Sequence, residues 1–69
     1  MDVIRDCKNR IACKGNAQTG DIETVYKGHK TRTRLPVGGV FTIERDDVIT
    51  KITRISNTAF KVESHAHAA

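Results

Sequence analysis

Apolar and polar side chains alternate along several short segments of the chain, as expected for β-strands that are buried on one face. In residues 21–27, Ile22, Thr24 and Tyr26 alternate with their neighbours. Similar alternation predicts further strands over residues 29–35, 40–45 and 58–64. Gly28 separates the first two strands and can adopt the backbone angles of a tight turn, so we expect these two strands to form a hairpin.

Residues 48–56 carry a less regular pattern. Ile49, Ile52 and Ile55 recur every three residues, a spacing that fits neither a simple strand nor an α-helix. The high content of β-branched residues favours a long strand, and a β-bulge within it would move the buried face midway. The alternative is a helix that is capped by one of the two preceding aspartates.

The N-terminal segment has the apolar spacing of a helix. Four apolar residues fall on one helical face: Val3, Ile4, Cys7 and Ile11. Asp2 can cap the start of this helix and Gly15 can end it, so we predict a helix over roughly residues 3–13. A first strand is the alternative, because residues 11–13 are short and apolar.

One short N-terminal helix followed by about five short antiparallel strands predicts a mainly β (α+β) domain. The strands would form a compact barrel or a strongly bent sheet. In the order and size of its elements the chain resembles the Sm-like and SH3-like small barrels, which implies a barrel of that kind. We expect a single domain over residues 1–64 and a flexible tail over residues 65–69.

The positive charge of the chain is unevenly distributed. The 69 residues carry a net charge of +4, and all of this excess lies in residues 1–34. A one-sided basic field favours polyanions such as nucleic acid or an acidic protein surface. The alternative is that the charge only keeps the protein soluble. A core of this size supplies limited stability, so homo-oligomerisation is a further option.

The segment K-G-H-K-T-R-T-R, residues 27–34, is the strongest candidate for a binding site. In a strand, Lys30, Arg32 and Arg34 would form one row, roughly 6–7 Å apart. This distance is close to the spacing of successive phosphates, and arginine adds bidentate contacts to phosphate. Three neighbours would extend the row or stack a base: Tyr26, Lys27 and His29. The alternative is an ordinary solvated strand face.

Other residues give no motif for catalysis or metal binding. A zinc site assembled from the cysteines and histidines would lack the usual ligand spacing; these residues are Cys7, Cys13, His29, His65 and His67. Cys7 fits better as a small core residue. Asp46 and Asp47 fit a turn better than a catalytic pair, and no nucleophile has a base predictably near it. We therefore expect no enzyme activity, no cofactor and no metal site.

Two functions are compatible with these patterns. The first is a small regulatory protein that binds RNA or DNA through phosphate contacts from the basic strand. The alternative is a small protein–protein interaction module or inhibitor, of the type that phages and mobile elements encode, that binds an acidic surface of a host protein. The chain has no apolar run of membrane-span length, no signal-peptide core and only two cysteines, so we expect a cytoplasmic location.

Overall fold

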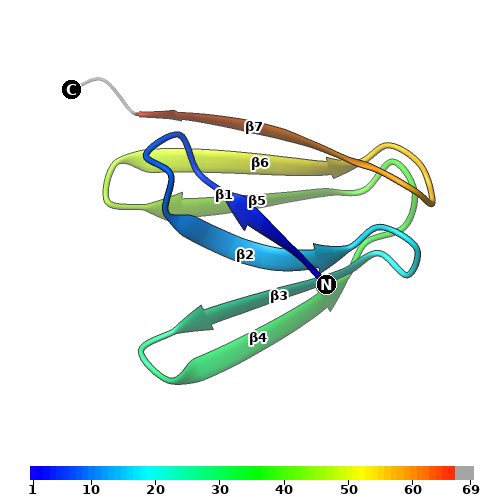
Figure 1. The fold of residues 1–69 in the computed structure, drawn as a ribbon, viewed down its shortest axis with the longest axis horizontal. Coiled ribbons are helices and arrows are strands. Elements are labelled where there is room, and N and C mark those ends of the chain that lie inside the picture. The colour runs from blue at the N-terminus through cyan, green and yellow to red at the C-terminus, as the bar shows by residue number, and fades with distance from the viewer. Residues whose placement is uncertain (67–69) are drawn as a thin grey trace.

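The chain folds into seven antiparallel strands arranged in two sheets (Figure 1). The structure is a computed structural model and describes residues 1–66. The strands are β1 (Asp2–Arg5), β2 (Ile11–Asn16), β3 (Asp21–Tyr26), β4 (His29–Arg34), β5 (Val40–Arg45), β6 (Val48–Arg54) and β7 (Phe60–Ala66). Strands β1–β2–β3–β4 form sheet A, and β5–β6–β7 form sheet B, each in sequence order.

Two hairpins have turns of only two residues. Tyr26 pairs with His29 across the β3–β4 turn, and Arg45 pairs with Val48 across the β5–β6 turn. The central residues of both turns have positive φ, which is the conformation that matches the twist of the flanking strands. The hairpin that we predicted around Gly28 is therefore confirmed.

The inner faces of the two sheets share one hydrophobic core. Its buried members are Ile4, Cys13 and Ile22 from sheet A, Ile52 from sheet B, and Leu35 from the connection between the sheets, with Phe41, Ile43 and Phe60 packed against them. Gly15 lets the sheets approach closely, because a Cβ at this position would lie 2.8 Å from Phe60 Cε2. Gly15 therefore allows β2 to pack closely against Phe60 of sheet B, and it does not end a helix.

The predicted helix over residues 3–13 is wrong, because the chain reverses direction between β1 and β2. The buried carboxylate of Asp6 accepts hydrogen bonds from the backbone N–H groups of Lys8 and Arg10, at 2.9 and 3.0 Å. Asn9 adopts a φ of 62° in the same loop. Of the four residues at helical spacing, only Ile4 is buried, and it pairs across the sheet with Cys13. The helical spacing of the apolar residues was therefore coincidental.

Residues 48–54 form a regular strand, as predicted, but without the expected bulge. Both neighbours of β6 pair with it in unbroken register. Its even-numbered residues face the core, so Thr50 and Arg54 occupy buried positions between the apolar ones. Two of the three isoleucines do not belong to the buried face: Ile49 is half-buried on the outer side and Ile55 is exposed. Polar residues on the inner face are what obscured the strand pattern.

The mainly β class fits this structure, but the predicted N-terminal helix is absent and there are seven strands in two sheets instead of about five in one barrel or bent sheet. Among residues 1–66 there is no helix, and the two sheets do not join into a barrel. The last strand reaches Ala66, two residues into the segment that we expected to be a tail, while residues 67–69 lie outside the described part of the chain. In residues 1–66 no helix is long and apolar enough to cross a membrane.

Candidate nucleic-acid interface

The three cations of the basic strand lie in one row on the outer face of sheet A. β4 pairs with β3 along its whole length, with Arg32 opposite Glu23 and Thr33 opposite Ile22. Ile22 is buried in the core, so Thr33 faces inward while Arg32 faces solvent. Lys30 and Arg34 follow Arg32 outward because side chains alternate along a strand.

Two carboxylates of β3 lie opposite this row and form ion pairs with all three cations. Arg32 Nη2 lies 2.9 Å and Lys30 Nζ 3.5 Å from the Glu23 carboxylate. Arg34 Nε lies 2.9 Å from Asp21 Oδ1. These acids alternate on the first strand of the predicted hairpin, but the cation that each acid meets follows only from the register of the two strands. The row is therefore partly neutralised and not a continuous track of free cations.

These ion pairs favour the charged forms of the two carboxylates and of the two arginines. The hydrogen bond from Arg32 lowers the pKa of Glu23, against the opposing effect of desolvation, and the nearby Lys30 charge lowers it further. The hydrogen bond from Arg34 likewise lowers the pKa of Asp21, with help from Thr19. The same contacts raise the pKa values of Arg32 and Arg34. A polyanion would have to compete with ionised carboxylates for these two arginines.

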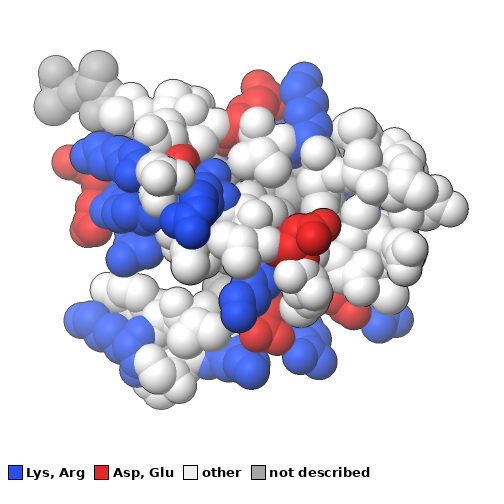
Figure 2. Space-filling model, in the orientation of Figure 1, with Lys and Arg blue, Asp and Glu red and all other residues white. Residues whose placement is uncertain are grey.

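Even so, sheet A carries the positive excess of the molecule. The outer-facing residues of β2, β3 and β4, together with the β3–β4 turn, include five cations and two carboxylates: Lys14, Lys27, Lys30, Arg32 and Arg34 against Asp21 and Glu23. The outer face of sheet B is balanced, with Lys51 and Lys61 against Glu44 and Glu63. Figure 2 shows the basic side chains along the lower margin of the view, over the β3–β4 hairpin. We call this basic set of sheet A the basic face.

The hairpin separates Tyr26 and His29 from the row. These two residues pair with each other at the turn and lie on the same side as Ile22, opposite to the cations. Tyr26 is 63% exposed, and Lys27 Nζ lies 5.4 Å from the centre of its ring. The six predicted site residues therefore divide between two faces of the hairpin, and only Lys27 at the turn can reach both.

A cleft of about 390 Å³ opens beside Tyr26, on the inner side of the hairpin end. The β2–β3 ladder stops at the pair of Lys14 with Glu23, whereas β3 continues to Tyr26 with β4. The cleft lies between this end of β3 and the β5–β6 hairpin, whose Ile43 and Arg45 line its far side. Figure 2 shows the corresponding hollow at the left of the view.

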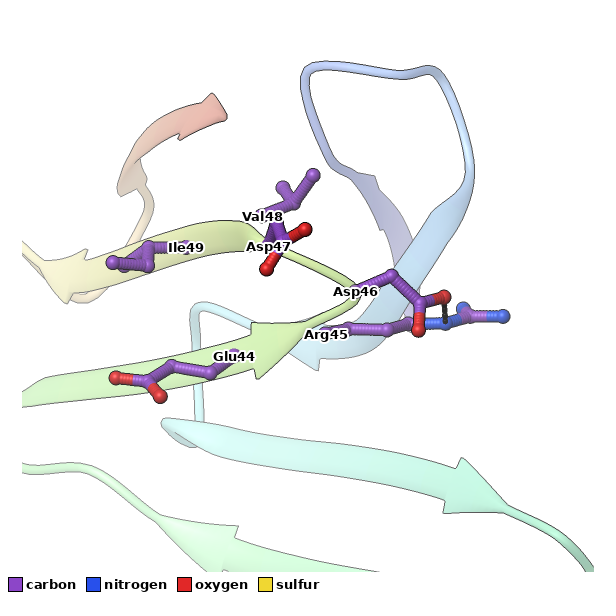
Figure 3. Close-up of a pocket in the computed structure, with 6 residues that line it drawn as sticks. All are labelled: Glu44, Arg45, Asp46, Asp47, Val48 and Ile49. Carbon is purple, nitrogen blue, oxygen red and sulfur yellow. Dashed lines mark ion pairs between the residues drawn. The ribbon is translucent and has the colours of Figure 1, made fainter. Parts of the chain in front are cut away.

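A second hollow surrounds the β5–β6 turn (Figure 3). Its carboxylates do not converge, since Glu44 and Asp46 point in opposite directions in this view. Asp46 forms ion pairs with Arg10, at 3.2 Å, and with Arg45, at 4.0 Å. Asp46 and Asp47 have φ values of 49° and 65°, so both serve the two-residue turn that we predicted for them.

The cysteines and histidines lie apart from one another. Cys13, and not Cys7 as expected, is the core cysteine, and burial raises its pKa to about 11. Cys7 is exposed in the β1–β2 loop, where its N–H donates to Ser64 Oγ at 2.9 Å. Within residues 1–66 no three or more His, Cys, Asp or Glu side chains lie close enough to hold a metal ion. His67 lies outside the described residues.

Comparison with known proteins does not assign the chain to a family. No model of a protein family matches the chain, and no curated protein or solved structure is significantly similar to it.

Proposed function

We propose that this protein binds nucleic acid through the basic face of sheet A. The observation that supports the proposal is the unequal charge of the two outer faces. Without the turns, the outer face of β2–β4 has a net charge of +2 and that of sheet B is neutral; with the β3–β4 and β5–β6 turns, the charges are +3 and −2. A polyanion would therefore be attracted to one side of the molecule, and the side chains that meet it are held in register by the sheet.

The composition of the face indicates the kind of contact that it makes. The outer-facing residues of β2, β3 and β4 include no aromatic side chain, and Tyr26 lies on the opposite side of the hairpin. Bases would therefore find no stacking platform beside the row. Lysine and arginine would contact phosphates instead, which makes binding depend steeply on salt and only weakly on sequence.

A fluorescence-anisotropy titration with labelled RNA and DNA at two salt concentrations tests this proposal. The double variant Lys14→Gln/Arg32→Gln removes two charges from the basic face. The matched variant Lys51→Gln/Lys61→Gln removes two charges from the outer face of sheet B. We expect the first to weaken binding about tenfold or more and to reduce the salt slope by about two, and the second to leave the slope unchanged.

Two outcomes would contradict the proposal. The first is that wild-type protein fails to bind any of the nucleic acids at low salt. The second is that both double variants weaken binding equally, because the position of the charges would then be irrelevant. Neutral glutamine is preferable to glutamate here, since a reversed charge at Arg32 would face Glu23 and destabilise the hairpin as well.

A further inference from the structure

The outer edge of β4 carries backbone groups that no strand of residues 1–66 pairs with. Across a two-residue turn the closing pair, Tyr26 and His29, exchange hydrogen bonds, and every second residue after His29 does the same. The N–H of Leu35 continues this alternation, because it donates to Gly20 O at 2.8 Å. The N–H and C=O groups of Lys30, Arg32 and Arg34 therefore point away from β3.

Figure 1 shows β4 as the last strand of sheet A, at the lower margin of the molecule, with no strand beyond it. Five of its six residues are exposed, and Thr33 is half-buried. An open edge of this length is a template for an added strand, since it offers three N–H donors and three C=O acceptors in fixed register.

The charges of this edge determine which strand it accepts. Residues that face each other across an antiparallel pair share one side of the sheet. A second copy of β4 would bring its cations against Lys30, Arg32 and Arg34, and like charges in such pairs are destabilising. A strand with a carboxylate at every second position would place each acid opposite one of these cations. The edge therefore disfavours self-association and favours an acidic partner.

The other open edges lack this preference. β1 has only four residues, and the charged side chains of β5 and β7 balance. In β5 Glu44 is followed by Arg45, and in β7 Lys61 is followed two residues later by Glu63. Among the open strand edges of residues 1–66, an acidic strand would thus gain complementary charge along its length only at β4.

We propose that the edge of β4 binds an extended acidic segment of a partner protein, which adds a fifth strand to sheet A. Its glutamates or aspartates alternate with other residues, and the backbone of the acidic positions pairs with Lys30, Arg32 and Arg34. This inference does not rest on nucleic-acid binding, although both ligands use the same three side chains and would exclude each other.

Three peptides test the proposal on the wild-type protein. The first alternates threonine and glutamate, in the order T-E-T-E-T-E-T, with blocked ends. The second carries N-methyl groups on its glutamates, which removes the N–H groups that would bond to β4. The third carries the same number of N-methyl groups on the last three threonines, whose N–H groups would face away from β4. All three have the same charge, so simple electrostatic attraction is matched between them.

Strand addition predicts a distinct result for each peptide. The first and third should bind with similar affinity. The second should bind at least about tenfold more weakly, because it cannot form the hydrogen-bonded ladder with β4. In NMR amide exchange, the first peptide should slow exchange at Lys30, Arg32 and Arg34, whereas Thr31, which already bonds to β3, should change little. Equal affinity for the first two peptides, an absence of binding, or unchanged exchange at the three amides would each overturn the proposal.

Discussion

The guanidinium group of Arg54 donates a 2.8 Å hydrogen bond from Nη1 to the carbonyl oxygen of Leu35, in the interior of the protein. Arg54 is only 9% exposed, and it forms no ion pair with any residue of the described chain. Its Nε and Nη2 atoms donate to the carbonyl oxygens of Ala17 and Gln18, both at 3.0 Å. Through these hydrogen bonds, one side chain of β6 connects sheet B to the β2–β3 turn and to the start of the β4–β5 connection.

Replacement of Arg54 should destabilise the fold strongly. In Arg54→Met three carbonyl oxygens would lose their donor, and a hydrogen bond from a charged group contributes about 1.5–3 kcal/mol. We expect a loss of about 3 kcal/mol or more, and Arg54→Lys should recover only part of it because an ammonium cannot reproduce the planar fork. Urea unfolding measures both values. Lys51→Met, on the exposed side of the same strand, is the control and should change stability by about 0.5 kcal/mol or less.

Gly20 and Gly28 form a matched pair for a test of the packing around the Arg54 guanidinium group. Both have nearly the same left-handed φ, 82° and 81°. A Cβ on Gly20 would collide with the carbonyl oxygen of Leu35 and lie 2.7 Å from Arg54 Nη1, whereas a Cβ on Gly28 would meet nothing within 4 Å. Gly28→Ala should cost about 1–2 kcal/mol for the backbone conformation alone. Gly20→Ala should cost several-fold more. Equal losses of unfolding free energy in urea would show that the carbonyl groups that accept from Arg54 are not tightly packed.

The two cysteines should react at very different rates with a thiol reagent. Cys7 is exposed, while Cys13 is 3% exposed in the core and burial raises its pKa to about 11. The thiolate is the reactive form, so the native protein should take up one label at Cys7 within the time that denatured protein takes up two. Mass spectrometry of the labelled protein after proteolysis identifies the site. Equal labelling of both residues would contradict the burial of Cys13.

The sequence was sufficient to predict those elements whose signals are local. The β3–β4 hairpin followed from alternation on both sides of Gly28, and the β5–β6 turn from the adjacent Asp46 and Asp47. The β1–β2 hairpin was missed because its buried side chains are few and its turn depends on Asp6, which accepts hydrogen bonds only after the loop has formed. In the same way, the row of cations was visible in the sequence, but its neutralisation by Glu23 became evident only from the register of two strands.

The ion pairs of the basic face should make stability depend on pH in the acidic range. Asp21 and Glu23 have pKa values that are lowered in the folded state, chiefly by hydrogen bonds from Arg34 and Arg32. The folded protein holds these groups ionised more firmly than the unfolded chain does, so their contribution is complete above the unfolded pKa values and is lost as the pH falls below about 4. Urea midpoints measured from neutral pH to about pH 2 should fall less steeply for Asp21→Asn/Glu23→Gln than for wild type. Parallel profiles would show that these pairs add no stability.

Neutralising Glu23 should increase the affinity for nucleic acid. The Glu23 carboxylate bonds to Arg32 and Lys30 and would repel a phosphate that approaches either cation. Glu23→Gln removes that competitor and should tighten binding roughly three- to tenfold at low salt, by the magnitude of one exposed charge–charge interaction.

Glu63→Gln is a matched control, because this carboxylate pairs with Lys61 at 3.8 Å on the neutral outer face of sheet B. Both variants change the net charge by one unit, so anisotropy titrations compare position alone. An equal gain for the two variants would mean that net charge, and not the basic face, governs binding, whereas a gain confined to Glu23→Gln would identify the ion-paired row as the surface that meets the phosphates.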